Sequence, residues 1–471
     1  MKSYKFIILI AAMLPFAALH SQSVTATDVL LGDANSAIVR DYNYNATIAC
    51  YNLDNDISVF VYNDPSMQST QVYIKNYYIN DFVISNDSVF FCGRTRMKVN
   101  GSIKGIVGIF DIQDLFFNSG DFSVQNVFTI YNDPHEGIEY ATEFHHLIAY
   151  LNSFNQRHVV CVGKGTQGHG CVVELIDGIA LQPTYWGYFA GIIEPENSES
   201  FHDIMLYDEY VVTAGFLDSE NRKLCLRVYN SDFVFDTYGP LNTRHTYDIQ
   251  SVLTGYSWPS DRVLIEEEST DILTVFTTLN TQAHNSPISL HLASFKLSSL
   301  LSNSIGSMTR SVELNFWTSS SYNRVNNIYF NQAYRKCMIM YNRNILISPF
   351  SSTTPFCEFT YPLPSNSGTL PEYYFDGVTL QGLTKYTAPY KYMMNGFNNA
   401  NPQQVFYSME TYNMLSDCAE SSEINYKDIS LVVAINEKVD FKTLVGSGHF
   451  DIEPHSNIEH TIIETQCGNN K

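Results

Sequence analysis

The sequence predicts an all-β protein, a β-propeller of six or seven blades, on three observations. Tyr, Phe, Val, Ile, Ser, Thr and Asn are abundant, with 32 Tyr and 30 Phe, and these residue types favour strands and turns. Apolar or alternating runs follow one another along the chain, separated by Asn, Asp, Gly and Ser. A strand–turn–strand pattern then recurs every 50 to 65 residues.

The clearest copies of this pattern are two thirteen-residue segments. Asp81 to Gly93 reads DFVISNDSVFFCG, and Asp203 to Gly215 reads DIMLYDEYVVTAG. Each has an Asp, a short strand, a polar turn suited to tight chain reversal, a second strand and a final Gly. A polar loop and a third strand follow both segments. Phe144 to Gly163 is a longer version of the same unit.

The units begin at recurring positions along the chain. An upstream unit made of SAIVRDY, ATIACYN and ISVFVYND precedes them, which gives six clear units and a seventh expected one. The entries of the blades are predicted near Ile79, Phe144, Phe201, Ser260, Val325 and Phe375.

A propeller explains units of this length better than the alternative, tandem β-sandwich domains. Blades of about four strands pack radially and leave only short protected edges. A sandwich needs ~100 residues, so each unit is too short to form one. Strands from both chain ends are expected to close the ring, with Ile429–Ile435 and Phe441–Ile452 as candidate strands of the last blade.

The N-terminus is predicted to be a secretory signal peptide, residues 1–21. Lys2 and Lys5 precede an apolar stretch from Phe6 to Leu19, after which the chain turns polar. The apolar stretch is shorter than the ~20 residues of a membrane-spanning helix. We therefore expect a single propeller domain over residues 22–471, secreted or held in the cell envelope after removal of the signal peptide.

The net charge of −21 argues against several classes of partner. Nucleic-acid binding needs a basic surface, and so does adhesion to an anionic membrane. A protein or glycan partner remains open, no cofactor is expected, and we expect a monomer.

Nine cysteines in an exported chain can oxidise, and the odd number leaves at least one unpaired. Cys161 and Cys171 flank a Gly-rich turn between two apolar strands, so a disulfide between them is a hypothesis. The chain contains no C-x-x-C pair, so a thiolate metal site has no support.

Polar pairs recur where the units begin. Because equivalent positions of a propeller form a ring, such pairs from different blades could converge at one mouth of the channel and bind a ligand. The alternative is that they bond to turns and strand ends and have a structural role. The candidate ligand-binding residues are Asn80, Asp81, His145, His146, His202 and Asp203.

Acidic stretches offer a second hypothesis, an enzyme acting on polysaccharide. Paired carboxylates carry out glycoside hydrolysis, and PHEGIE, EPENSE and EEE (beginning at Pro134, Glu194 and Glu266) are rich in them. Nothing in the sequence fixes their separation, and no catalytic or metal-binding residue is assigned.

The Ile79–Gly93 unit with its third strand GIVGIF resembles secreted β-propeller proteins of uncharacterised function from gut-type Gram-negative bacteria. The resemblance implies the fold and export, and it carries no catalytic residues. The leading hypothesis is a non-catalytic propeller that binds a protein, peptide or glycan through one face. The alternatives are a polysaccharide hydrolase or lyase and a structural component of a cell-surface assembly.

Overall fold

The structure is a computed structural model. The signal peptide predicted at residues 1–21 lies outside the residues that the structure describes. These are 24–29, 34–43, 46–53, 56–63, 70–98, 102–116, 126–132, 139–165, 170–177, 186–193, 198–218, 223–232, 243–248, 257–281, 288–302, 308–316, 325–331, 336–341, 344–349, 367–375, 377–385, 391–400, 404–411, 419–429, 436–439 and 448–452.

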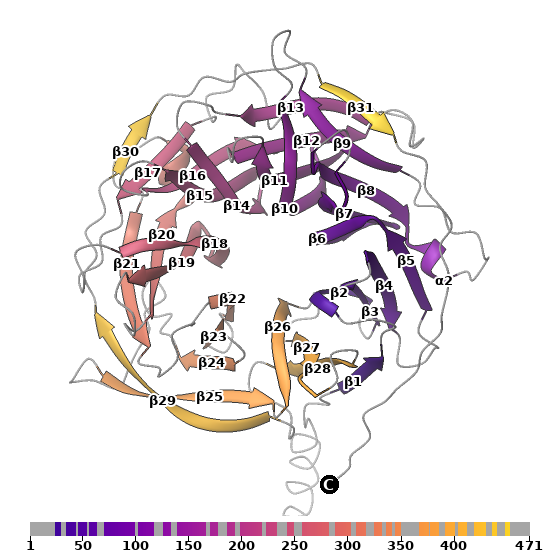
Figure 1. The fold of residues 1–471 in the computed structure, drawn as a ribbon. Helices are drawn as coiled ribbons and strands as arrows, with labels where there is room; N and C mark the ends of the chain where they lie inside the picture. The colour runs from indigo at the N-terminus through magenta and orange to yellow at the C-terminus, as the bar shows by residue number, and fades with distance from the viewer. Residues whose placement is uncertain are drawn as a thin grey trace, which may run out of the picture.

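The described strands form antiparallel sheets arranged in a ring (Figure 1), so the predicted propeller class is confirmed. The sheets contain four, nine, five, nine and four strands, because some neighbouring blades share a sheet. For description we group the strands in chain order into blades 1 to 7, and we name the strands of a blade A to D from the centre outwards. Blade 1 consists of β2 (Ala34–Asn43), β3 (Ala46–Leu53), β4 (Ile57–Asn63) and β5 (Thr70–Lys75), and blade 2 of β6 (Tyr77–Ser85), β7 (Ser88–Thr95), β8 (Gly105–Asp111) and β9 (Asn126–Asn132). Blade 3 consists of β10 (Glu139–Leu151), β11 (Arg157–Gly165), β12 (Gly170–Asp177) and β13 (Trp186–Ile193), and blade 4 of β14 (Ser198–Tyr207), β15 (Tyr210–Asp218), β16 (Lys223–Asn230) and β17 (Thr243–Asp248).

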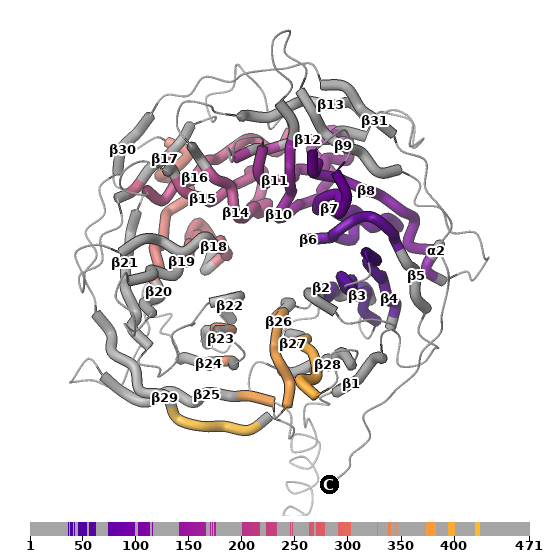
Figure 2. Tube along the Cα trace, viewed as in Figure 1, coloured from indigo at the N-terminus to yellow at the C-terminus, as the bar shows by residue number. Residues whose placement is uncertain are grey.

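The ring closes in blade 7, where the first described strand, β1 (Val24–Val29), pairs antiparallel with β28 as the outermost strand. Figure 2 follows the chain round the ring from blade 1 in indigo to blade 7 in orange. Blade 5 consists of β18 (Ser257–Ser269), β19 (Ile272–Thr281), β20 (Ile288–Lys296) and β21 (Met308–Phe316), and blade 6 of β22 (Val325–Asn331), β23 (Lys336–Tyr341), β24 (Asn344–Pro349) and β25 (Ser367–Phe375). The first three strands of blade 7 are β26 (Val378–Lys385), β27 (Lys391–Asn398) and β28 (Gln404–Thr411).

Three strands after blade 7 return along the outside of the ring, in yellow in Figure 1. β29 (Ala419–Ile429) pairs with the D strands of blades 5 and 6, β30 (Asn436–Val439) with that of blade 4, and β31 (Gly448–Ile452) with that of blade 2. The expectation that Phe441–Ile452 supplies a strand of the last blade is therefore wrong for its described part. The fourth strand of that blade is β1, from the N-terminal side.

The positions named in the sequence as blade entries lie at the following places in the strands. Five of them lie within β6, β10, β14, β18 and β22. Phe375 instead ends β25, the D strand of blade 6, and the A strand of blade 7 begins at Val378. Among the described residues, the helices α2 (Gln113–Phe116) and α3 (Leu297–Leu301) each take up only about one turn, too short to cross a bilayer.

The core lies between the blades because each sheet buries both faces against its neighbours. Between blades 3 and 4, side chains from β10, β11 and β12 pack against side chains from β14, β15 and β16. Burial of such apolar surface stabilises the ring by about 25 cal/mol per Å². This layer contains Tyr150, Val160, Val162, Val172, Phe201, Ile204, Val211 and Tyr229.

The predicted disulfide between Cys161 and Cys171 does not form. Cys161 lies opposite Val173 in the β11–β12 pairing, while Cys171 lies opposite Gly163, so the two residues are out of register. Cys161 is a free, buried thiol. It shares a core layer with Cys92 of blade 2, and burial and hydrogen bonding to Cys161 raise the pKa of the Cys92 thiol.

The glycine that ends the repeated pattern makes room for a carbonyl group. The A strands of blades 2 and 4 each have a β-bulge, between Ile79 and Asp81 and between Phe201 and Asp203. A Cβ on Gly215 would overlap the Ser200 carbonyl oxygen before the bulge, and Gly93 faces the Tyr78 carbonyl in the same way. The recurrent Gly is therefore required by the bulge opposite it.

We expect Gly215→Ala to lower the free energy of unfolding by about 3 kcal/mol, because the added methyl group collides with main chain that cannot move aside. Urea unfolding followed by intrinsic fluorescence measures this. The matched control is Gly377→Ala. Its Cβ meets no atom, but its φ of 67° disfavours Ala, so about 1 kcal/mol is expected. Equal losses in the two variants would contradict the steric explanation.

Candidate functional site

The predicted site residues sit at the bulges of the A strands, on the inner rim of the ring. A bulge places two residues of one strand opposite a single residue of its partner. The register shifts occur at Asn80 in β6, His145 in β10 and His202 in β14. The polar pairs recognised in the sequence therefore occupy equivalent positions in blades 2, 3 and 4, as expected for a ring.

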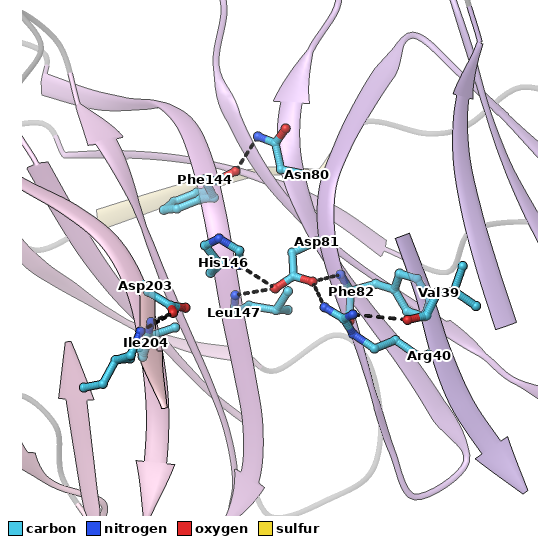
Figure 3. A network of polar contacts seen from close by, with 11 residues as sticks. Val39, Arg40, Asn80, Asp81, Phe82, Phe144, His146, Leu147, Asp203 and Ile204 are labelled. Atoms are coloured by element: carbon cyan, nitrogen blue, oxygen red, sulfur yellow. Dashed lines mark hydrogen bonds and ion pairs between the residues drawn. The ribbon is translucent and has the colours of Figure 1, made fainter. Parts of the chain in front are cut away.

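The two aspartates at these bulges join one blade to the next (Figure 3). Asp81 Oδ1 accepts the amide of Phe82 in its own strand, and Oδ2 accepts the amide of Leu147 in blade 3 at 3.3 Å. Asp203 does the same in blade 4, accepting the amide of Ile204 at 2.9 Å and that of Ile265 in blade 5 at 2.8 Å. Each carboxylate is thus a bridge between adjacent A strands.

Two asparagines also bridge neighbouring blades. Asn80 donates from Nδ2 to the Phe144 carbonyl in blade 3 at 2.6 Å. Asn52 of β3 is fully buried, and its amide donates to the Ile79 carbonyl and accepts from the Ile79 amide in blade 2. Because a side-chain amide carries both a donor and an acceptor, it can bond to the N–H and the C=O of a residue in the next blade, with which its own strand does not pair.

The histidines of the predicted set diverge in their surroundings. His146 Nδ1 lies 3.2 Å from Asp81 Oδ2. His202 Nε2 lies 2.9 Å from Ser200 Oγ in its own strand, and its ring meets Phe216 edge-on. His145 is half-buried at the bulge of β10. The structure thus brings together Asp81 and His146, and it leaves His202 in a separate environment.

Asp81 forms the centre of a charged network that includes a residue the sequence analysis missed. Arg40 of β2 in blade 1 donates from Nη2 to Asp81 Oδ1 at 2.5 Å and from Nε to the Phe82 carbonyl at 3.1 Å. Asp81 is buried, whereas Arg40 and His146 are partly exposed. The only sequence signal for Arg40 was its place in the apolar run SAIVRDY, where a charged residue is unusual.

The network holds Asp81 in its ionised form. Burial alone would raise the pKa of this carboxyl, but the Arg40 guanidinium, His146 and the Leu147 amide outweigh burial, so the pKa lies below its usual range. Both carboxylate oxygens already accept hydrogen bonds. Such a carboxylate is a poor proton donor, because a general acid needs a pKa near the working pH.

The described residues contain no group of three or more His, Cys, Asp or Glu side chains arranged to hold a metal ion. Of the acidic stretches, only Glu139, Ser198–Glu199 and Glu266–Glu268 fall within the described residues, at the A strands of blades 3, 4 and 5. The rest of PHEGIE and EPENSE lies outside them. Arg40, Asp81 and His146 remain a group of blade-bridging side chains at the inner rim.

A second candidate surface lies on the face of the ring that carries the A–B turns and the C–D connections, which we call the turn face. In blades 2 to 5 each A–B turn contains a residue with positive φ: Asn86, Asn155, Asp208 and Asp271. Asn and Asp tolerate this left-handed conformation better than other side chains. The same turn geometry therefore recurs in four consecutive blades.

Hydrogen bonds hold these turns against the neighbouring connections. The Glu209 carbonyl of blade 4 accepts from the Ser231 amide at 2.9 Å, and Asp87 in blade 2 and Asp271 in blade 5 make equivalent bonds. In blade 3 the Asn152 side chain accepts from the amides of Phe154 and Gln156. The turn face is thus built from turns of defined shape.

The blade 3 turn rests on a buried polar chain. Asn152 Nδ2 lies 2.9 Å from His158 Nε2, and His158 Nδ1 lies 2.5 Å from Glu174 Oε1. With the amide donating to Nε2, the ring donates from Nδ1 to the carboxylate, which is an assignment from the geometry. His158 and Glu174 are almost completely buried. They orient Asn152, and Asn152 orients the turn above it.

Large apolar side chains are exposed on this face. Phe154 in the blade 3 turn is 63% exposed, Leu151 before it is 47% exposed, and Leu206 beside the blade 4 turn is 38% exposed. The fourth large apolar side chain exposed among the described residues is Met97, which lies in the B–C connection on the opposite face.

We expect Asp81→Asn to lower the free energy of unfolding by about 2 kcal/mol near neutral pH, because a charge-assisted bond to Arg40 is lost. The lowered pKa of Asp81 adds stability above the unfolded value of about 4, and that stability is lost as the pH falls below it. The difference between wild type and variant should therefore shrink as the pH falls below about 4.

Urea unfolding at a series of pH values measures this difference. Asp208→Asn, in an exposed turn with φ of 50°, is the matched control for the loss of one negative charge. A gap between wild type and Asp81→Asn that stays constant down to the lowest pH would contradict the role given to the Asp81 carboxylate.

No protein-family model and no curated protein matches this sequence. Solved structures with a similar arrangement of strands include the polysaccharide lyase Uly1, at 8% identity and a TM-score of 0.45, covering 81% of this chain and 90% of that one. The α-L-arabinanase of Penicillium chrysogenum has 10% identity and a TM-score of 0.40, with 84% and 99% covered. Domains 1–2 of Drosophila Semaphorin 1b have 9% identity and a TM-score of 0.42, with 82% and 86% covered.

Proposed function

We propose that this chain is an exported, non-catalytic binding module that engages a macromolecular partner through its turn face. The observation that carries the proposal is that three of the four large apolar side chains exposed among the described residues lie on this face. Leu151 ends β10, Phe154 lies in the turn that follows it, and Leu206 lies near the end of β14 in the next blade. Exposed apolar groups that gather in one place, with polar residues around them, commonly mark an interaction site.

The shape of the turns supports this proposal. Binding costs free energy when flexible side chains and loops become ordered, at about 0.5–1.5 kcal/mol per immobilised side chain. The amides of Phe154 and Gln156 donate to the Asn152 side chain and order the turn in the unbound protein. Less conformational entropy of the turn is therefore lost when a partner binds. Aromatic side chains, Phe among them, are also enriched in the cores of protein interfaces.

The inner-rim residues support a binding role over a catalytic one. Asp81 and Asp203, the aspartates of the predicted site, accept backbone amides from the neighbouring blade. The general acid of a glycoside hydrolase is a carboxyl group with a raised pKa. The pKa of Asp81 is lowered, so Asp81 does not fit the general-acid role.

Export is proposed on the N-terminal segment, with the mature protein secreted or retained in the cell envelope. The resemblance to secreted propellers of gut-type Gram-negative bacteria points in the same direction. An exported module with a rigid face is suited to contact a protein or glycan outside the cytoplasm.

The proposal is tested by binding to arrays of glycans and of peptides, comparing wild type with Phe154→Ala. A loss of about tenfold or more in apparent affinity is expected, as for the truncation of an interface anchor. Met97→Ala is the matched control, because Met97 is equally exposed on the opposite face. Ligands whose binding survives Phe154→Ala but not Met97→Ala would overturn the assignment of the turn face.

A second measurement addresses catalysis. The purified protein is incubated with a panel of neutral and acidic polysaccharides, and new reducing ends and unsaturated products are assayed. Turnover that is abolished by His146→Gln, with the unfolding midpoint unchanged, would replace the binding module with a hydrolase or lyase. Stable co-purification with other envelope proteins that survives Phe154→Ala would favour the structural component instead.

A further inference from the structure

The turn face carries an excess of acidic side chains around its apolar residues. Among the described side chains of blades 2 to 5, the acidic residues at the A–B turns and C–D connections outnumber the basic ones. Arg157 and Lys296 are the basic residues there. The acidic residues are Asp87, Asp111, Asp208, Glu209, Asp232, Glu267 and Asp271.

Three of these carboxylates lie next to the exposed apolar side chains. Asp208 and Glu209 are exposed in the blade 4 turn, directly after Leu206 and the buried Tyr207. Asp232 of blade 4 accepts the amide of Ser153 at 3.0 Å, which fixes its carboxylate beside the turn that displays Phe154. The apolar centre is therefore bordered by negative charge.

The backbone of Asp232 also joins the two blades at this point. The Asp232 carbonyl oxygen accepts from Asn152 Nδ2 at 3.4 Å, and the same Nδ2 lies 2.9 Å from His158 Nε2. The blade 3 turn and the blade 4 connection are thus tied to one another through Ser153 and Asn152. Phe154 and Asp232 consequently belong to one continuous surface that spans both blades.

Exposed apolar residues on the two faces have different neighbours. Met97, on the opposite face, lies between Arg96 and Lys98, both basic. Phe154 and Leu206, on the turn face, have carboxylates beside them. Since like charges in contact cost affinity and opposite charges steer association, each surface selects the sign of its partner.

We infer that the surface formed by Leu151, Phe154, Leu206, Asp208, Glu209 and Asp232 binds a basic protein segment that contributes an apolar side chain. This inference rests on the proposed binding function and names the partner. The aromatic and aliphatic centre favours a protein over a glycan, because an interface core is apolar and aromatic and its rim is polar. The surrounding carboxylates favour Lys and Arg, and they disfavour acidic peptides and acidic glycans.

The charges and the apolar centre contribute to binding in different ways. Exposed carboxylates act mainly on the rate of association and are screened by salt, with a Debye length of about 8 Å at physiological ionic strength. Desolvated apolar anchors act mainly on the rate of dissociation. Binding of a basic apolar segment should therefore weaken as salt is added, without disappearing.

The experiment uses the full mature chain and four synthetic probes in fluorescence anisotropy. The first probe is a short peptide of Lys and Leu with one Phe. The second replaces every Lys with Glu, the third replaces the apolar residues with Ser, and the fourth is heparin. Binding is measured at about 50 and about 300 mM salt, where screening differs strongly.

Two variants separate the contributions. Asp208→Asn with Glu209→Gln removes two charges and keeps the apolar centre, and we expect roughly tenfold weaker binding of the first peptide with a smaller salt dependence. Phe154→Ser keeps the charges and should weaken binding by about tenfold or more at both salt concentrations. Met97→Ser, on the opposite face, is the matched control and should change nothing. Circular dichroism of each variant confirms that the exposed substitutions leave the fold intact.

The outcomes distinguish the inference from the function it rests on. Failure of the first peptide to bind, or equal binding of the Glu peptide or heparin, overturns the basic partner. If the preferred probe is then lost on Phe154→Ser, the turn face still binds and the proposed function stands. If Phe154→Ser changes the binding of no probe, both the inference and the choice of this face fall.

Discussion

The side-to-side bond between adjacent inner strands is the constraint on which this structure depends. Backbone pairing in a propeller runs outward within each blade, so neighbouring blades must be joined by other groups. Here the carboxylates of Asp81 and Asp203 provide the join, each accepting one amide from its own strand and one from the next blade. The bulge beside each Asp turns the carboxylate sideways, and the Gly opposite the bulge makes the turn sterically allowed.

The dual use of polar residues explains why the inner rim looked like a functional site in the sequence. A ring of Asp, Asn and His at equivalent positions is what a ligand-binding channel would show, and it is also what blade joints require. Asn80 and Asn52 both bond to backbone of the neighbouring blade, as a blade joint requires. The Asp81 carboxylate accepts the Leu147 amide of the neighbouring blade, and it is also in contact with the side chains of Arg40 and His146.

The repeat, and hence the propeller, could be predicted from the sequence because the joint leaves a local signature, an Asp and a Gly at fixed spacing. The partners of each Asp could not be predicted, because Arg40 and Leu147 lie in other blades and no local pattern connects them to Asp81. The error over Cys161 and Cys171 has a related cause. The turn between them suggested that they were opposite each other, whereas strand register, which places Cys161 opposite Val173, depends on the whole sheet.

The C-terminal strands have a consequence for how the chain folds. β31 pairs with β9, and the partners Gly448 and Asn132 are more than 300 residues apart. Contacts this distant in sequence form slowly, because the loop must close before the pairing repays its entropy. During synthesis the outer edge of blade 2 stays open to other strands until residues 448–452 have been made. These strands therefore cover the outer edges late, and a chain cut short before them would expose unpaired strand edges that can pair with other chains.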